Sequence, residues 1–164
     1  MKLSTRARYA LRSMIAISRL GDGSAPVSLQ EVAGLTHISR RYLDLLFIAL
    51  RNAALLKSTA GRRGGYQLAK PAKDIRVGEI VEASIGRINI VECVGHPDDC
   101  FLSDTCECRL LYSLVNHRIR DVFFDYSLAD LTDKAWVAEM RSRQAERAPA
   151  QTKPAKRRAR MEAP

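Results

Sequence analysis

The sequence predicts a mainly α-helical protein with a small β-wing, arranged as a winged helix-turn-helix domain followed by a long C-terminal dimerisation helix. Three observations lead to this prediction. Apolar residues recur at helical spacing up to about residue 54 and again beyond residue 109. Two capped segments flank a tight turn near residue 37. A glycine-rich turn between two short β-prone stretches comes directly after the second capped segment.

The first expected helix covers residues 4–20. Ser4 has a side chain that is preferred at a helix N-cap, because its oxygen can accept a hydrogen bond from a free backbone N–H. The run Gly21-Asp22-Gly23-Ser24 ends the helix. Its apolar residues fall at helical spacing: Tyr9, Ala10, Met14, Ile17 and Leu20.

Two more helices are expected on either side of a tight turn. Ser28 and Glu31 form a capping-box pattern, which starts a short helix over residues 29–35. Ser39 caps a third helix over residues 40–54. Two short helices joined in this way are typical of a helix-turn-helix, although simple helical hairpins share the pattern. The apolar face of the third helix is Leu43, Leu46, Phe47 and Leu50.

A β-hairpin is expected directly after the third helix. Residues 56–60 and 66–69 suit strands, and Gly61-Arg62-Arg63-Gly64-Gly65 suits the turn between them. Two arginines at the tip of such a hairpin indicate a wing that contacts an anionic surface. The alternative is an ordinary hairpin with a solvated tip.

The rest of the chain is expected to be helical around one loop. Residues 77–83 suit a short helix and residues 85–91 an apolar extended segment, and Ser127 starts a final helix with Leu128, Leu131 and Trp136 facing inward. The expected units are 1–83 for the winged helix-turn-helix domain, 84–108 for the connecting segment and cysteine loop, 109–146 for the dimerisation and C-terminal helices, and 147–164 for a disordered basic tail.

The long helix carries a broad apolar stripe. A stripe of this width is more than a small monomer comfortably covers, which favours a dimer seam. Packing back onto the helix's own domain is an equal alternative. The stripe consists of Leu110, Leu111, Leu114, Val115, Ile119 and Val122.

Charge is distributed unevenly along the chain. The formal net charge is +9 and the isoelectric point is about 9.8, which favours a polyanionic partner. Arginines concentrate in residues 1–80, whereas residues 92–107 contain acidic side chains and no Lys or Arg. The N-terminal part therefore suits an anionic partner and the cysteine region does not.

The sequence predicts a cytoplasmic protein. No apolar stretch approaches the ~20 residues of a membrane span. The N-terminal apolar stretch is interrupted by Arg12 and Arg19, unlike a signal peptide. Thiols stay reduced in the cytoplasm, so four cysteines there indicate a metal or redox site more than a disulfide framework.

The start of the third helix supplies the candidate DNA contacts. A recognition helix places its N-terminal residues against base edges, where arginine pairs with guanine and a carboxylate accepts from cytosine N4. Asp44 has an alternative role in favouring the helix dipole. The full candidate set is Ser28, Ser39, Arg40, Arg41, Tyr42 and Asp44, with Arg62, Arg63 and Gly64 from the wing.

The four cysteines lie in one loop, as Cys93-x6-Cys100-x5-Cys106-x-Cys108. Soft thiolates select zinc, copper(I) or iron–sulfur, and long gaps suit a cluster better than the paired spacing of zinc ribbons. If a helix starts at Cys106, Cys108 points about 200° away from it and cannot share its centre. We therefore predict Cys93, Cys100 and Cys106 as ligands and leave the fourth open. The candidates for it are Cys108, His96, Asp98, Asp99 and Asp104. Free thiols are the alternative.

Taken together, these stretches resemble the winged-helix regulators typified by the iron–sulfur cluster regulator IscR and the nitric-oxide-responsive NsrR. The resemblance spans roughly residues 1–135 and implies a homodimer on a palindromic operator, a long dimerisation helix and, in the cluster-binding branch, a 2Fe-2S or 4Fe-4S centre. It rests on residues 1–10, 38–47, 61–68 and 77–80 and on the three-cysteine loop.

The sequence departs from that family at the cluster. Six residues separate Cys93 from Cys100 where the family has five. Arg109 occupies the position at which IscR-like members have a histidine ligand. NsrR-like members use an acidic residue near position 8 of the partner subunit, and this sequence has Arg8 there. Neither fourth ligand transfers, which makes Cys108 the leading local substitute.

Three functions compete at this point. The first is a DNA-binding regulator, expected to be a repressor, that senses iron–sulfur, redox or nitric-oxide status. The second is the same DNA module with a thiol switch, zinc or a partner protein as its signal. The third is a module that binds a metabolic enzyme. No enzyme is expected, because paired carboxylates, a nucleophile motif and a phosphate-binding loop are absent outside the wing.

Overall fold

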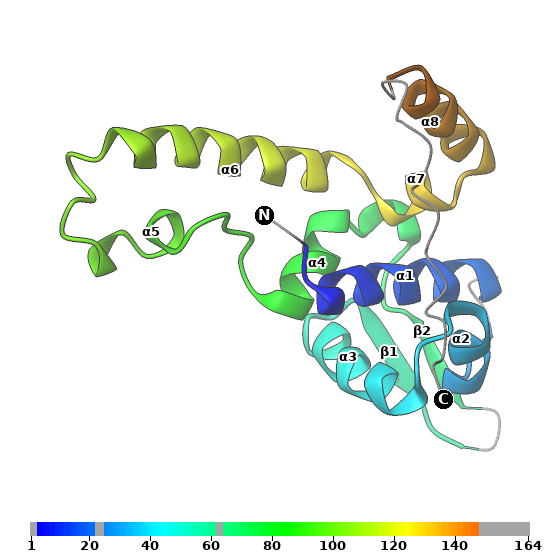
Figure 1. Ribbon diagram of the computed structural model, residues 1–164. Helices are drawn as coiled ribbons and strands as arrows, with labels where there is room; N and C mark the ends of the chain where they lie inside the picture. Colours follow the sequence, from blue (N-terminus) through cyan, green and yellow to red (C-terminus); the bar gives the residue numbers. More distant parts are fainter. Residues whose placement is uncertain (1–2, 22–24, 62–63, 148–164) are drawn as a thin grey trace, which may run out of the picture.

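The computed structural model describes residues 3–21, 25–61 and 64–147. A body of helices and one small sheet carries a projecting arm, formed by residues 86–125 (Figure 1). The body contains α1 (Thr5–Leu20), α2 (Leu29–Thr36), α3 (Arg40–Asn52), β1 (Leu56–Thr59), β2 (Gly65–Leu68), a 3-10 turn (Ala72–Asp74) and α4 (Val77–Ile85). The remaining elements are α5 (Glu92–Gly95), a 3-10 turn (Pro97–Asp99), α6 (Glu107–Asp125), α7 (Leu128–Thr132) and α8 (Lys134–Arg147).

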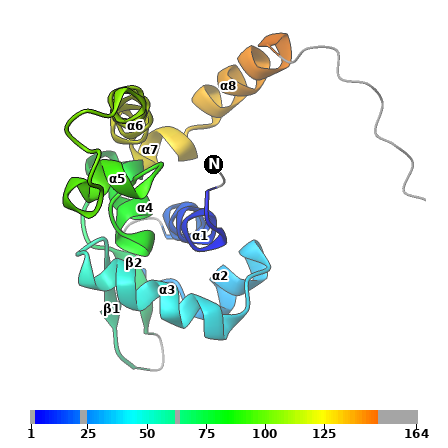
Figure 2. The same cartoon turned by 60° about the vertical axis from the view of Figure 1, so that its left-hand side comes forward.

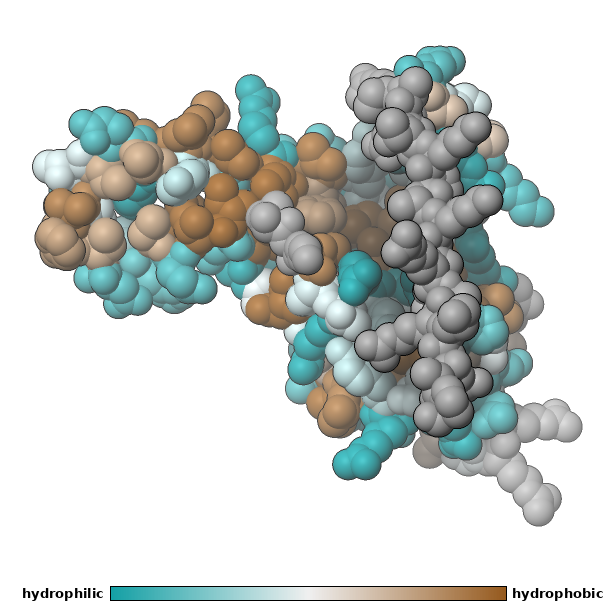
Figure 3. Space-filling model, in the orientation of Figure 1, coloured by the Kyte–Doolittle hydropathy of each residue, from teal (hydrophilic) through white to brown (hydrophobic). Residues whose placement is uncertain are grey.

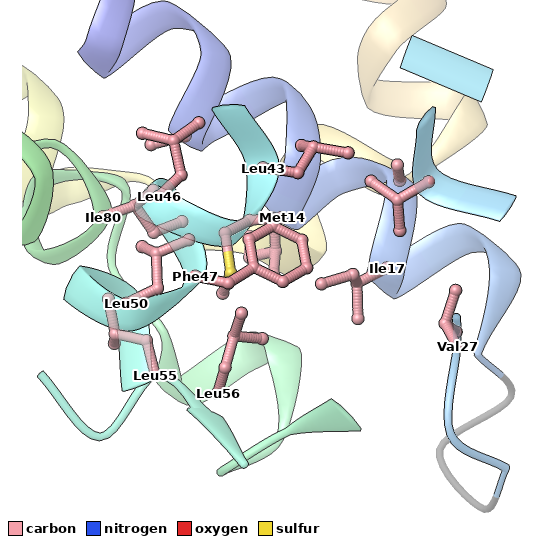
Figure 4. Close-up of a cluster of buried hydrophobic side chains, with 14 of the residues drawn as sticks. Met14, Ile17, Val27, Leu43, Leu46, Phe47, Leu50, Leu55, Leu56 and Ile80 are labelled. Carbon is pink, nitrogen blue, oxygen red and sulfur yellow. The ribbon is translucent and has the colours of Figure 1, made fainter. Parts of the chain in front are cut away.

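One apolar core holds the body together. Phe47 of α3 is fully buried and meets the ring of Tyr66 in β2 edge to face, with the ring centroids 4.7 Å apart. This contact fixes α3 against the wing. Figure 4 shows how the core side chains converge from α1, α3, β1 and α4; they include Met14, Ile17, Leu43, Leu46, Leu50, Leu56 and Ile80.

The predicted caps start the predicted helices. The Ser4 side chain accepts from the Ala7 N–H at 3.1 Å. At α2 the Ser28 hydroxyl accepts from the Glu31 N–H at 3.2 Å, while the Glu31 carboxylate accepts from the Ser28 N–H at 2.8 Å. The capping box predicted from the sequence is confirmed. It also lowers the pKa of Glu31, because the Ser28 hydroxyl and N–H both donate to the ionised carboxylate.

The β-sheet contains the two expected strands and one contact that the sequence did not reveal. β1 and β2 pair antiparallel, with Leu56 opposite Leu68. Val27, before α2, forms an isolated bridge with Tyr66 through two backbone hydrogen bonds of 2.9 and 2.8 Å. A Cβ at Gly65 would overlap the Val27 carbonyl, so glycine is required where the two backbones approach. This bridge ties the wing to the start of the helix-turn-helix.

Polar contacts hold the arm where it leaves the body. Asn116 is the buried residue of α6, and its amide donates to the Ile88 carbonyl at 3.2 Å and accepts from the Ile90 N–H at 3.0 Å. These bonds align the segment after α4 with α6. Ile85, expected in an extended segment, instead belongs to α4, and no strand is assigned over residues 86–91.

The single helix expected from Ser127 is two helices. Ser127 caps α7 through a capping box with Asp130, and Leu128 is buried as predicted. Asp133 then leaves the helical conformation, and its carboxylate accepts from the N–H groups of Ala135 and Trp136. The chain restarts there as α8, which extends away from α7 (Figure 2). A local Asx-type cap therefore overrides the helical periodicity.

Two sequence expectations fall outside this description. The basic tail beyond residue 147 and the wing arginines Arg62 and Arg63 lie outside the described residues. Among the helices that the structure does describe, none combines the length and apolar character needed to cross a membrane.

Candidate nucleic-acid interface and cysteine loop

α3 presents a polar N-terminal turn to solvent. Ser39 caps the helix by accepting from the Tyr42 N–H at 3.4 Å, and Arg40, Arg41 and Asp44 are all exposed. The Arg40 guanidinium donates to the Gln30 side chain of α2 at 3.2 Å. Both guanidiniums and one carboxylate are thus displayed at the end of the helix that would meet base edges.

Tyr42 is placed differently from its neighbours. Its ring is half-buried and packs edge to face on Tyr9 of α1, with ring centroids 5.6 Å apart. The Arg12 guanidinium lies over the Tyr9 ring at 5.8 Å. Tyr42 therefore supports the angle between α1 and α3 through its ring.

The turn between α2 and α3 depends on a residue that the sequence analysis did not single out. His37 adopts the left-handed conformation, with φ 56° and ψ 31°, and its N–H donates to the Ala33 carbonyl at 2.9 Å. The next residue, Ile38, is buried and anchors the turn in the core. Histidine is one of the few non-glycine residues enriched in this conformation. This preference was the only feature of the sequence that could have indicated the role of His37 in the turn.

The described part of the wing is built close to α3. Gly64 donates its N–H to the Gly61 carbonyl at 2.9 Å, which joins the two described ends of the wing. Arg51, near the end of α3, donates to the Ser58 hydroxyl of β1 at 3.4 Å. Exposed cations therefore flank α3 at both ends: Arg40, Arg41, Arg51 and Lys57.

The cysteine loop lies at the far end of the arm. Cys93 is in α5, Cys100 follows the second 3-10 turn, and Cys106 is the N-cap of α6. These three are half-buried, while Cys108 is exposed as the second residue of α6. Cys108 could share a metal centre with Cys106 only if the helix started beyond Cys108. α6 instead starts at Glu107, so this condition is not met.

The Arg109 side chain holds the two ends of this loop together. Its Nε donates to the Cys93 carbonyl at 3.0 Å, and its Nη1 donates to the Ser103 carbonyl at 3.1 Å. The guanidinium therefore joins two backbone segments of the loop. The sequence identified Arg109 only as a residue that cannot ligate metal, and its bridging role follows from the fold.

The cysteine set suits an iron–sulfur cluster in the chemistry of its donors. Three half-buried thiols in one loop without Lys or Arg between Glu92 and Glu107 supply the soft ligands that such clusters take. In the described residues, however, no three His, Cys, Asp or Glu side chains already stand in a metal-binding arrangement.

α6 leaves an apolar surface uncovered in the single chain. Figure 3 shows apolar side chains gathered along the arm. Leu110 is 71% exposed, and a shallow groove lies on the same helix between Leu114 and Phe123. The exposed apolar side chains of α6 are Leu110, Leu111, Tyr112, Leu114, Val115 and Val122.

Comparison with known proteins agrees with this architecture. The family described as Rrf2, iron-dependent transcriptional regulator, matches residues 3–134. The transcriptional regulator IscR of Vibrio atlanticus is 33% identical over 144 residues, which are 88% of this chain and 82% of that protein. It is named as an HTH-type transcriptional regulator, not as an enzyme.

Solved structures give the same result. CymR, the global cysteine regulator of B. subtilis, superposes with a TM-score of 0.66 at 32% identity, covering 80% of this chain and 96% of that one. IscR of T. potens gives 0.63 at 28% identity, covering 93% and 94%. With its capped helix-turn-helix, its wing and a family match over most of its length, the chain belongs to the Rrf2 family of DNA-binding transcriptional regulators.

Proposed function

We propose that this regulator is a homodimeric, sequence-specific repressor that places α3 in the major groove of double-stranded DNA. The observation that carries the proposal is the exposed start of α3, which is capped by Ser39 and displays Arg40 and Arg41. Arg40 and Arg41 can pair with guanine, and Asp44 can accept from cytosine N4. Ser28, at the start of α2, and the wing residues Arg62, Arg63 and Gly64 would contact the sugar–phosphate backbone or the minor groove.

Binding to DNA from its own upstream region tests this assignment. Arg41→Ala should weaken specific binding by about 1–3 kcal/mol, because a bidentate base contact is lost. Arg141→Ala is the matched control, since Arg141 is exposed on α8, away from the proposed interface. Unchanged operator affinity in both Arg40→Ala and Arg41→Ala would contradict the placement of α3.

The proposed dimer uses the apolar stripe of α6. Two such helices packed together would cover the side chains that one chain leaves exposed. A two-fold dimer would present two copies of α3 to two half-sites, so we expect a palindromic operator. Leu114→Glu should yield monomers in sedimentation velocity at concentrations where the unchanged protein is dimeric. A monomeric unchanged protein would contradict the dimer.

For the sensing site we propose an iron–sulfur cluster, 2Fe-2S or 4Fe-4S, held by Cys93, Cys100 and Cys106. The fourth ligand stays open, and Cys108 can supply it only if the first turn of α6 unwinds. When bound, the cluster supplies iron that responds to oxidants and nitric oxide. The chain's own contribution is to keep the thiols in one half-buried loop at the start of α6. Release of Arg109 from its two carbonyls would open that loop.

Anaerobic purification tests the cluster directly. A coloured protein that contains iron and sulfide supports it, and Cys93→Ala should lose the colour. Cys108→Ala decides whether the exposed cysteine takes part. A colourless protein with four titratable thiols in the unchanged chain and three in Cys93→Ala would rule out the cluster.

A thiol switch, zinc or a partner protein is the second candidate for the signal. The two hydrogen bonds from Arg109 to the Cys93 and Ser103 carbonyls favour it, because they hold the cysteine loop together through the protein's own contacts. The structural relative CymR is named as a regulator of cysteine, which is a second reason to test it. A change in operator affinity on mild oxidation, in colourless protein, would support a thiol switch.

Since a DNA-binding regulator acts where the DNA is, we place the protein in the cytoplasm.

A further inference from the structure

The centre of the outward face of α3 is apolar. The buried residues of α3 define its inward direction, and a rotation of 100° per residue puts Arg41, Leu45 and Ile48 on the opposite line. Leu45 is 56% exposed and Ile48 is 50% exposed, and neither belongs to the core. A helix that contacted only hydrogen-bonding groups of the bases would not need two aliphatic side chains at this position.

We propose that Leu45, supported by Ile48, contacts the 5-methyl group of a thymine in the operator. The inference rests on the proposed DNA-binding role of α3. In the major groove the thymine methyl is the apolar group that base pairs display, and apolar side chains recognise it by direct contact. Leu45 lies in the second turn of α3, closer to the base-reading end than Ile48, so Leu45 should carry the larger effect.

Charge on the same face favours DNA over a protein as the occupant. Arg41 precedes Leu45 by one turn, and Arg51 follows Ile48 by three residues, both exposed. A protein that covered the two aliphatic side chains would also have to neutralise these cations, whereas DNA phosphates border the groove that admits the helix.

The spacing predicts where the thymine lies. Four residues of helix from Arg41 to Leu45 advance about 6 Å along the axis. This advance is close to two base steps of about 3.4 Å each. The thymine should therefore lie within about two base pairs of the guanine that Arg41 reads.

The experiment removes the methyl group from the DNA and the side chain from the protein. The preferred site of the full-length chain is first selected from random duplexes. Each thymine in it is then replaced by deoxyuracil, which pairs identically but lacks the methyl. One position per half-site should weaken binding by about fourfold, as expected for one methyl-sized apolar contact. Leu45→Ala should bind the thymine and deoxyuracil duplexes equally.

Leu20→Ala is the matched control, because Leu20 is an exposed leucine at the end of α1, and it should keep the full preference for thymine. If the unchanged protein binds its site in a salt-dependent manner but ignores every deoxyuracil, the Leu45 inference is wrong and the DNA-binding role stands. A Leu45→Ala protein that keeps the thymine preference also overturns it, as does one that loses self-association instead. If no site is selected, the proposed operator binding itself fails.

Discussion

The body and the arm of this protein are stabilised in different ways. The body buries one continuous apolar core that joins α1, α2, α3, β1 and α4. The arm contains the 19-residue α6, whose buried residue is the polar Asn116 and whose leucines face outward. Backbone-directed bonds from Asn116 and Arg109 hold the arm, and Ile119 and Phe123 of α6 pack on a small buried cluster of the body. The body is therefore stabilised by its own core, whereas the arm depends on a few local contacts and on a partner surface that covers its exposed apolar side chains.

The largest effect should come from the body core. Phe47→Ala removes a fully buried ring that packs on Tyr66 and should lower the free energy of unfolding by about 3–5 kcal/mol. Denaturant unfolding followed by circular dichroism measures it.

Val122→Ala in the arm is the comparison. Val122 is 57% exposed on α6, so its loss should change the unfolding of the single chain by at most about 0.5 kcal/mol. If the two substitutions cost the same at high dilution, the proposed difference between body and arm does not hold.

The joint between the two regions should respond next. Gly78 of α4 lies against the ring of Phe124 in α6, and a Cβ on Gly78 would overlap that ring. Gly78→Ala should therefore push α6 away from α4 and cost about 1–3 kcal/mol. The double substitution Gly78→Ala with Phe124→Leu should recover part of this loss, which denaturant unfolding can measure. Equal stability of Gly78→Ala and the unchanged protein would show that the joint is loose.

The body was more predictable from sequence than the arm, for a physical reason. Helix caps are local: Ser28 and Glu31 stand three residues apart, so their pairing can be read directly. The Val27 bridge and the Asn116 clamp join residues that are distant in the chain, and no spacing signals them. Arg109 was recognised as a missing ligand, but its bonds to two carbonyls follow only from the closed loop.

The candidate site divides in the same way. The start of α3 could be predicted because capping and exposure follow helical periodicity. Tyr42 was predicted as a DNA contact, whereas its ring packs on Tyr9. The sequence could not indicate this packing, because helical periodicity does not specify which residue of another helix an aromatic ring meets. Contact with DNA and ligation by the cysteines stay predictions.

Local opening of the arm should depend on Arg109. Arg109→Ala removes donors to the Cys93 and Ser103 carbonyls and should lower the free energy of loop opening by about 1–2 kcal/mol. Hydrogen exchange over residues 93–106 and alkylation of Cys93 should both accelerate, while exchange in α1 and α3 stays unchanged. Arg109→Lys retains the charge without the two-pronged geometry and should recover little. Acceleration throughout the body would contradict a clamp confined to the arm.

The smallest effect should come from the capping box that starts α7 where the arm returns to the body. The Ser127 N–H and hydroxyl donate to Asp130 at 2.7 Å and hold the pKa of that carboxyl below its ordinary value of 3.8. The ionised form is therefore favoured by folding, so its contribution is complete above that ordinary value and disappears as pH falls through the lowered pKa. Ser127→Ala should cost about 0.5–1 kcal/mol at neutral pH. NMR titration of Asp130 should show its pKa rising toward the ordinary value in Ser127→Ala, whereas the pKa of Glu31, lowered by its own cap in the body, should not move. If both carboxyls shifted together, α7 and α2 would be coupled through the core to which Leu128 belongs.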